Sequence, residues 1–261
     1  MTELVQRFAE LVARPDAAIP LDEAALLISV HAHPGLDVGE QLGRLDDLAA
    51  ACPEPTLEGL RRHLFADVGF TGNAVRYNDP RNSFLNEVLD RKTGIPISLA
   101  VLTMEVGRRI GVTLEGVGMP GHFLVRHVGD PPVLLDAFSG GRILDEQDAQ
   151  ALFRRLSGSV ALTPDLLVAA PARAILTRML ANLRNLYEQA GDVASLGWVM
   201  RLRATIPAGS IQELADVAAV QASLGQFTEA ARTLEDIADQ LPETHAERLK
   251  GEARLLRSRL N

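Results

Sequence analysis

The sequence predicts an α+β protein that is mostly helical and carries one small antiparallel sheet. Three observations point to this class. Apolar residues recur at helical spacing through the first 70 residues and again from about residue 170. Between these regions, short apolar runs alternate with Gly and Pro, which is typical of strands and turns. Near the C-terminus a helical segment repeats with a period close to 34 residues.

The N-terminal region, residues 1–75, is expected to be a helical packing layer. Within it, apolar side chains follow the i, i+3, i+4, i+7 pattern of one buried helix face. Pro34–Gly35 is a stop signal for the second of these helices. The predicted helices fall at residues 2–14, 20–35, 37–52 and 55–69.

A loop rich in Asn, Gly, Asp and Pro follows at residues 70–84. The next segment predicts a short helix with Asn82 or Ser83 as its N-cap and Gly94 as its stop. A longer helix is then expected over residues 95–111. Its first turn would hold Pro96, which is well tolerated there because the missing N–H has no helical partner in any case.

Three strands are expected after that helix, at residues 112–119, 122–128 and 132–139. A five-residue turn between the last two would place Asp136 opposite Leu124, and therefore diagonal to His122 on one face of the sheet. A change of one residue in register would separate the two side chains. A further helix should begin near residue 145, with Asp145 as its N-cap.

The last region, residues 166–261, is expected to form tetratricopeptide-type helices. The stretch Leu186–Leu196 resembles Val220–Ala230, with Gly191 and Gly225 in equivalent places 34 residues apart. Glycine at the turn between two helices, repeated at this period, is typical of tetratricopeptide repeats. Pro207 and Pro242 are expected to end the second helix of each repeat, so about two repeats are predicted.

Composition limits the classes of function. The chain has 261 residues, of which 47% are apolar and only 4% aromatic, so aliphatic side chains must fill the core. The net charge is −8 and the basic residues are scattered, which argues against a nucleic-acid partner. No uninterrupted apolar run reaches about 18 residues, so no membrane association is expected. The single cysteine, Cys52, rules out an internal disulfide and suggests a reducing, cytoplasmic setting.

A nucleophile, a histidine and a carboxylate follow one another in the middle of the chain. Ser98 stands at a helix start, His122 opens one strand and Asp136 ends the next. A helix N-terminus favours a developing anion, a nearby His can take the proton, and a carboxylate can orient the imidazole. Each residue also has a purely structural interpretation: Ser98 as a helix cap, His122 as a donor to a backbone carbonyl, and Asp136 as a loop cap.

The same region resembles a known family. The motifs "DPRNSFLN", "GIPISL" and "PGHFLVR" are similar to the transglutaminase-like core of the bacterial SirB family, whose members often end in tetratricopeptide repeats, and the same core occurs in some eukaryotic F-box proteins. The resemblance implies a papain-like core at residues 76–165. It also implies the order Cys at a helix start, then His, then Asp, and puts His122 and Asp136 in the last two places.

The chain departs from that pattern at the cysteine place. Around "GIPISLAVL" only Ser98 bears a nucleophilic atom, and a hydroxyl is far harder to ionise than a thiol. Two hypotheses follow. The first is a non-catalytic or weakly active transglutaminase-like protein that binds a peptide or protein partner through its cleft or repeat surface. The second is an active amide hydrolase or acyltransferase that uses Ser98, His122 and Asp136.

Two asparagines are further candidates for the cleft. Asn82 and Asn86 lie in a short segment dense in polar groups, and could offer amide donors to an oxyanion or simply cap and bridge helices. No metal is expected, because His31 and His33 have no third ligand nearby in the sequence. No cofactor is expected either, because the glycines of "GVGMPGH" precede a strand rather than join a strand to a helix.

Overall fold

The computed structural model of the chain describes residues 2–119, 121–157, 167–207, 218, 222, 227–238, 241 and 243–258. The chain divides into two compact units. One unit is Asp16–Leu186, and the other combines Met1–Pro15 with Tyr187–Asn261. Within the described ranges, no helix combines the length and the apolar character needed to cross a bilayer.

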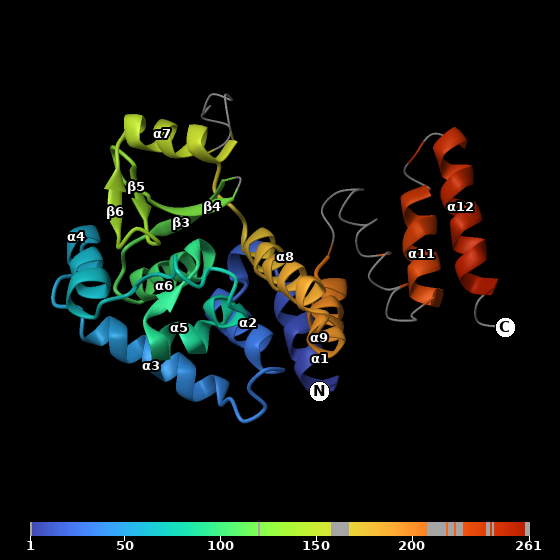
Figure 1. The fold of residues 1–261 in the computed structure, drawn as a ribbon, viewed down its shortest axis with the longest axis horizontal. Helices are drawn as coiled ribbons and strands as arrows, with labels where there is room; N and C mark the ends of the chain where they lie inside the picture. The colour runs from blue at the N-terminus through green and yellow to red at the C-terminus, as the bar shows by residue number, and fades with distance from the viewer. Residues whose placement is uncertain are drawn as a thin grey trace. The chain divides into compact units, whose positions relative to one another are not determined.

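The larger unit contains helices, a four-stranded sheet and a short two-stranded pair (Figure 1). Its helical elements are η1 (Asp16–Ala18), α2 (Leu21–Ser29), α3 (Val38–Ala50), α4 (Leu57–Arg61), the π-helical η2 (Arg62–Asp67), η3 (Pro80–Ser83), α5 (Leu85–Arg91), α6 (Pro96–Arg109), α7 (Glu146–Ser157) and the first part of α8 (Ala172–Ala190). Its strands are β1 (Thr71–Gly72), β2 (Thr93–Gly94), β3 (Leu114–Met119), β4 (His122–His127), β5 (Val133–Asp136) and β6 (Arg142–Leu144).

The four longer strands form an antiparallel sheet in the order β3-β4-β5-β6. On β4 and β5, Val125 is opposite Leu135 and Arg126 is opposite Leu134. The next rung in this register brings Leu124 opposite Asp136, as the sequence predicts. The predicted α+β class is therefore confirmed, with a mostly helical chain around one small antiparallel sheet. β1 and β2 add a separate two-residue parallel pair.

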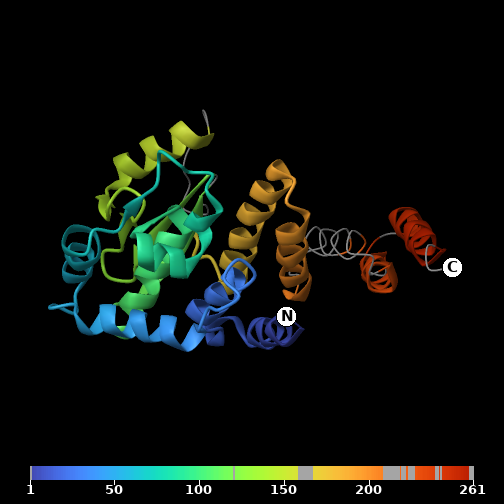
Figure 2. The same ribbon diagram turned by 60° about the horizontal axis from the view of Figure 1, so that its bottom comes forward.

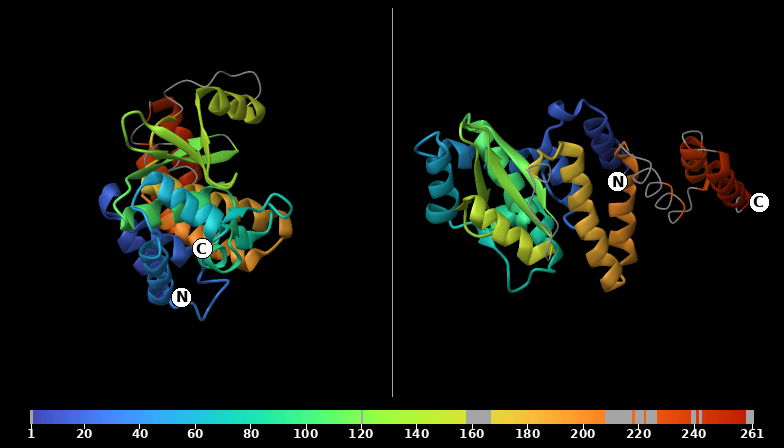
Figure 3. Two further views of the ribbon diagram at one scale, coloured as in Figure 1. Left: turned by 90° about the vertical axis from the view of Figure 1, so that its left-hand side faces the viewer. Right: turned by 90° about the horizontal axis from the view of Figure 1, so that it is seen from above.

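Helices cover the sheet (Figure 1). Leu152 and Phe153 of α7 pack into an apolar cluster with Val117, Leu124 and Leu144 of the strands. Figure 3 shows α7 lying against the strands, and α6 contacts both β3 and β4. Because strand side chains alternate, one strand can supply apolar groups to two different layers.

Helix α6 is the centre of the larger unit. Eleven of its residues are buried, and it contacts α2, α3, α4 and α5 as well as the sheet. α2 is also buried along almost its whole length, which is expected of a helix with neighbours on every side. A π-helical stretch, Arg62–Asp67, follows α4 directly.

The described residues of the smaller unit lie mainly in helices. α1 (Thr2–Val12) packs against α9 (Val193–Thr205), and α11 (Phe227–Ala238) packs against α12 (Glu243–Ser258). α11 and α12 lie side by side in Figures 1 and 2. Between α8 and α9 the chain turns at Gly191, whose φ of +67° suits glycine. Of the residues in the predicted second repeat, Val220, Gly225 and Pro242 lie outside the described residues.

Both ends of α5 differ from the sequence prediction, and α2 ends at Ser29, well before the predicted stop at Pro34–Gly35. α5 begins after Phe84 rather than at Asn82 or Ser83, because those two residues are already used in the 3-10 turn η3. It ends at Lys92, which adopts a left-handed conformation with φ of +56°. Gly94 is instead part of β2. Pro96 does open α6 as predicted, and the Asp145 carboxylate accepts the Asp148 N–H at the start of α7.

Candidate functional site

His122 and Asp136 form a direct hydrogen bond. Nε2 of His122 lies 3.0 Å from Oδ1 of Asp136, and both side chains are buried. An ionised carboxylate only accepts, so Nε2 carries the donated hydrogen. Nδ1 is therefore the nitrogen of His122 that can exchange a proton with a neighbouring group. The structure thus brings together two of the three residues of the predicted constellation.

The Asp136 carboxylate is held by several donors. Besides His122, it accepts the backbone N–H groups of Phe138 and Ser139 and the Ser139 hydroxyl, the last at 2.7 Å. Burial opposes ionisation of this carboxyl, but these hydrogen bonds and the His122 ring bring the pKa of Asp136 below its ordinary value. Asp136 is consequently an anion that orients the imidazole and at the same time caps the turn after β5.

Ser98 is engaged by the backbone around the start of α6. Its hydroxyl is fully buried, donates to the Asn82 carbonyl at 2.6 Å and accepts the Ile95 N–H at 3.1 Å. A side chain at the third helical position that reaches back to the N-cap N–H completes a helix cap. A Cβ on Gly94 would lie only 2.6 Å from the Ser98 hydroxyl oxygen, so glycine at that position leaves room for the cap.

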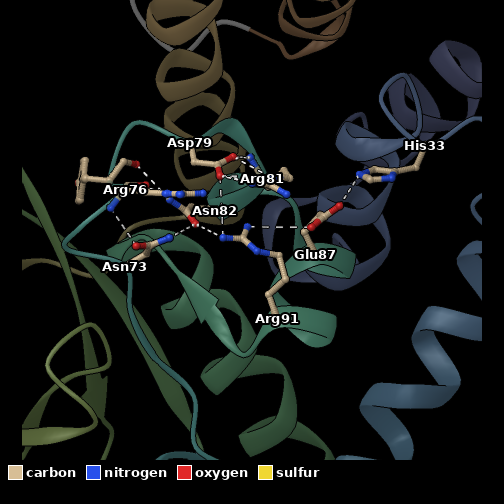
Figure 4. Close-up of polar contacts among 9 residues, drawn as sticks. His33, Asn73, Arg76, Asp79, Arg81, Asn82, Glu87 and Arg91 are labelled. Carbon is tan, nitrogen blue, oxygen red and sulfur yellow. Dashed lines mark hydrogen bonds and ion pairs between the residues drawn. The ribbon is translucent and has the colours of Figure 1, made fainter.

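Asn82 is the centre of a polar cluster beside this cap (Figure 4). Its side-chain nitrogen donates to the carbonyls of Arg76 and Tyr77, and its side-chain oxygen accepts from Asn73 and Arg91. Asp79 and Arg81 form a neighbouring ion pair at 2.7 Å. Asn82 therefore ties the 73–79 loop to α5 and α6, and its amide is already bonded on both sides.

Asn86 is buried on the first turn of α5. Its side-chain oxygen has no hydrogen-bond partner among the described residues. A buried amide oxygen without a partner is uncommon and costs free energy. The sequence marks both Asn82 and Asn86 as candidates for the cleft, and the structure gives them different surroundings.

A small cavity adjoins the His122 ring. Its volume is about 60 Å³. Its walls come from the 73–79 loop, the first turn of α6, the start of β4 and helix α8, and include Tyr77, Pro96, Ile97, His122, Arg178 and Asn182. The two residues that α6 contributes are therefore a proline and an isoleucine, neither of which bears a nucleophilic atom.

Arg178, Asn182 and Tyr77 are residues that sequence reasoning missed. Arg178 and Asn182 come from α8, in a region that the sequence assigns to repeats. Nη2 of Arg178 donates to the carbonyls of Met119 and His122, each at 2.7 Å. These carbonyls flank the turn between β3 and β4.

A second, larger cavity of about 670 Å³ lies at the other end of α6. Its walls are mainly apolar and include Ile19, Met104, Val112, Leu114 and Ile175. Glu105 and Arg108 also line it.

Buried charges surround Glu105. Arg109 donates to Asp22 at 2.7 Å and to the Glu105 carboxylate at 3.2 Å. Burial, together with the charge of Asp22, raises the pKa of Glu105 to about 7. Burial opposes ionisation of Asp22 as well, but its hydrogen bonds from Arg109 and the Glu23 backbone lower the pKa of Asp22 below its ordinary value. The two carboxyls therefore differ in protonation near neutral pH.

No group of three or more His, Cys, Asp or Glu side chains in the described ranges is arranged to hold a metal ion. Cys52 lies in the segment after α3, where its thiol donates to the Glu54 carbonyl at 3.3 Å. The walls of the small cavity come from other segments of the chain.

Comparison with known families agrees with the fold. Residues 19–181, more than half of the chain, match the model of the transglutaminase-like superfamily. The chain belongs to this superfamily. The matched span includes His122, Asp136 and every wall of the small cavity except Asn182, which lies one residue beyond its end.

Relatives extend this assignment. A UPF0162 protein of Xylella fastidiosa (strain 9a5c) is 40% identical over 201 residues, which is 70% of each chain. A UPF0162 protein of Pseudomonas aeruginosa is 34% identical over 201 residues, 73% of each chain. F-box only protein 21 of Mus musculus is 31% identical over 144 residues, which cover 52% of this chain and 22% of that protein. No solved structure matches the chain.

Proposed function

We propose that this transglutaminase-like chain is a peptide- or protein-binding module with little or no catalytic activity. The observation that carries the proposal is the composition of the small cavity. α6 presents Pro96 and Ile97 there, beside His122, where the family resemblance leads one to expect a cysteine. A general base without an adjacent nucleophile cannot start acyl transfer by the covalent route.

The environment of Ser98 also favours binding over catalysis. Its single hydroxyl hydrogen is directed to the Asn82 carbonyl at 2.6 Å, and a lone pair accepts the Ile95 N–H. To attack a substrate, the hydroxyl would have to leave both partners and unmake a buried helix cap. Loss of such buried hydrogen bonds costs about 1–3 kcal/mol for each group left unpaired.

The C-terminal helices supply the second part of the proposal. Helix pairs of the tetratricopeptide type commonly form surfaces that bind other proteins. The turn at Gly191 and the paired helices α11 and α12 are in keeping with such a region. We also keep two expectations as proposals: membership of the SirB branch of the superfamily, and a cytoplasmic setting, which a chain with one cysteine suits.

The alternative is an amide hydrolase or acyltransferase that uses Ser98, His122 and Asp136. One observation favours it, namely the hydrogen bond of 3.0 Å between His122 and Asp136, which orients an imidazole as a catalytic base requires. Catalysis and binding make different predictions for the same substitutions.

The catalytic test measures ammonia release from glutamine peptides and amine release from peptide amides. We expect the unmodified chain to show no turnover that is lost in His122→Ala. If turnover is found and is lost in both His122→Ala and Ser98→Ala, while circular dichroism shows that both variants remain folded, the hydrolase is correct and the binding proposal is wrong.

The binding test uses a random peptide library on beads and the full chain. Tyr77 lines the cavity and is 43% exposed, so Tyr77→Ala should fold and should weaken binding of selected peptides by about tenfold or more. Val75→Ala is a matched control, because Val75 lies on the same loop and is 95% exposed. Absence of any selected peptide, or equal binding by both variants, would contradict the proposal.

A further inference from the structure

The small cavity has the size of a single anionic group. Its volume of about 60 Å³ corresponds to roughly two water molecules, since one water occupies about 30 Å³ in the liquid. A carboxylate fits such a volume, whereas a whole amino-acid side chain and its backbone do not. The cavity can therefore receive the end of a ligand but not its body.

Arg178 gives this cavity a cation. Within the described part of the chain, both of its hydrogen bonds leave from Nη2 and both acceptors are neutral carbonyls, those of Met119 and His122. No described carboxylate lies within ion-pair distance of its guanidinium. The guanidinium also lies 5.4 Å from the centre of the Phe123 ring, which contributes a weak cation–π contact.

The position of Arg178 leaves its charge poorly compensated. Burial lowers the pKa of Arg178, which means that its surroundings favour the charged form less than water does. Two carbonyl dipoles and a ring face stabilise a cation less than a carboxylate does. An anion that enters the cavity would therefore meet a half-buried cation with hydrogens still available on Nη1 and Nε.

Other groups in the walls of the small cavity also favour an anionic ligand. Tyr77, which bears a hydroxyl, and Asn182, which bears an amide, both line the cavity, and the first turn of α6 contributes the positive end of the helix dipole. The Asp136 carboxylate is occupied by His122, the Ser139 hydroxyl and two backbone N–H groups. Of the groups in the cavity walls, the Arg178 guanidinium only donates, the Tyr77 hydroxyl and the Asn182 amide can donate, and Nδ1 of His122 can do so once it is protonated.

We propose that the cavity formed by Tyr77, His122, Arg178 and Asn182 binds the carboxylate of a ligand. The carboxylate comes either from a small organic acid or from the C-terminus of a peptide. This inference rests on the proposed binding function and names the group that the site recognises. The space beside His122, where the resemblance leads one to expect a catalytic cysteine, is then a binding site for the carboxylate of a ligand.

The test uses the full chain and three defined probes: sodium acetate, N-acetyl-Ala-Ala with a free carboxylate, and the same dipeptide as its C-terminal amide. Binding is followed by calorimetry and by the NMR signals of the His122 ring. We expect acetate to bind in about the millimolar range and to shift the His122 signals, since four heavy atoms limit its affinity. The free dipeptide acid should bind at least about tenfold tighter than its amide.

Two substitutions with matched controls examine the site itself. Asn182→Asp changes no volume and places a like charge in the cavity, so it should weaken binding of the dipeptide acid by about tenfold or more. Asn185→Asp, on an exposed position of the same helix, should leave binding unchanged. Arg178→Gln should act like Asn182→Asp, with Arg173→Gln as its control. If Arg178→Gln fails to fold, Asn182→Asp still decides the matter.

The outcomes separate this inference from the proposed function. If acetate shifts the His122 signals but the dipeptide acid binds no tighter than acetate, the ligand is a small acid. If the dipeptide acid is tighter, it is a peptide C-terminus. If library peptides bind equally as acids and as amides, the binding function holds and the carboxylate site is wrong. If neither acetate nor the dipeptide acid shifts the His122 signals, or if Asn182→Asp binds as the unmodified chain does, the carboxylate site is wrong as well.

Discussion

The two ends of helix α6 border two cavities with opposite chemistry. At its N-terminal end, a serine hydroxyl closes the helix against neutral backbone groups, and the adjoining cavity of about 60 Å³ is lined by a cation and neutral donors. At its C-terminal end, Arg108 and Arg109 meet the carboxyls of Asp22 and Glu105 beside a cavity of about 670 Å³. At the N-terminal end of α6 the cation, Arg178, has no carboxylate partner among the described residues. At the C-terminal end the arginines and carboxyls form ion pairs.

This difference shows that burial alone does not set the charge of a group. Asp136 and Glu105 are both buried carboxyls, yet the pKa of the first lies below its ordinary value and that of the second is raised to about 7. Asp136 has four donors in contact, whereas Glu105 shares two arginines with a second carboxyl. The charge of Asp22 beside Glu105 adds to the effect of burial, whereas at Asp136 the hydrogen bonds and the His122 ring outweigh burial.

The largest effect is expected from Arg109→Ala, at the paired end. The Arg109 side chain is only 11% exposed and contacts Asp22, Asp46 and Glu105. Its removal leaves two buried carboxyls with only the exposed Arg108 as a shared partner, so the free energy of unfolding should fall by about 3–5 kcal/mol. Urea unfolding at pH 7 measures this. A loss below about 1 kcal/mol would show that the arginine is not what holds these carboxyls.

Ser98→Ala is expected to have the next largest effect, and it acts at the other end. The substitution removes two buried hydrogen bonds, while the Ile95 N–H keeps its bond of 3.3 Å to the Asn82 carbonyl, so stability should fall by about 1–3 kcal/mol in total. Ser29→Ala is the control, because the Ser29 hydroxyl only adds a bond to the Leu26 carbonyl within its own helix. If both variants lost the same free energy of unfolding, the Ser98 cap of α6 would stabilise the fold no more than an ordinary hydroxyl within a helix does.

Glu105→Gln sharpens the comparison through pH. A carboxyl whose pKa is raised in the folded state keeps its proton when the unfolded chain has lost it, so stability falls as pH rises from about 4.5 to 7. Asp22, Arg108 and Arg109 face this carboxyl. We expect the protein to lose about 1–3 kcal/mol between pH 5 and pH 8, and the variant to lose less. Glu58→Gln, on the surface, should leave the slope unchanged. If the stability of Glu105→Gln fell with pH as steeply as that of the unmodified chain, the raised pKa would not belong to Glu105.

The smallest effect is expected from Arg108→Ala. Its side chain is 61% exposed, although it contacts both Glu105 and Asp22. Solvent screens such a pair and Arg109 remains in place, so the loss of stability should not exceed about 1 kcal/mol. Unfolding in urea beside Arg109→Ala gives the comparison directly. Similar losses in the two arginine variants would show that exposure does not distinguish them.

Local sequence patterns predicted much of this fold, for physical reasons visible in particular residues. Pro96 marks the start of α6 because proline suits only the first helical turn. The spacing of His122 and Asp136 fixes their diagonal relation once the turn has five residues. Both signals act over fewer than 20 residues of chain.

Contacts between distant segments could not be predicted in this way. Arg178 reaches His122 across 56 positions, and Arg108 reaches Asp22 across 86. Neither pair has a local periodicity, since the tertiary fold alone brings the residues together. For the same reason the sequence marks Ser98 as a nucleophile or a cap without deciding between them, because the deciding partner, the Asn82 carbonyl, depends on how η3 packs against α6.

The bonds of Asn82 have a kinetic consequence. Through its amide and its carbonyl this residue joins the loop that carries Tyr77 to the start of α6, so two walls of the small cavity are fixed to each other before any ligand arrives. A preformed cavity requires no rearrangement on binding. Ligands that share the same carboxylate end group should then associate at similar rates. What distinguishes one ligand from another would be how long it stays.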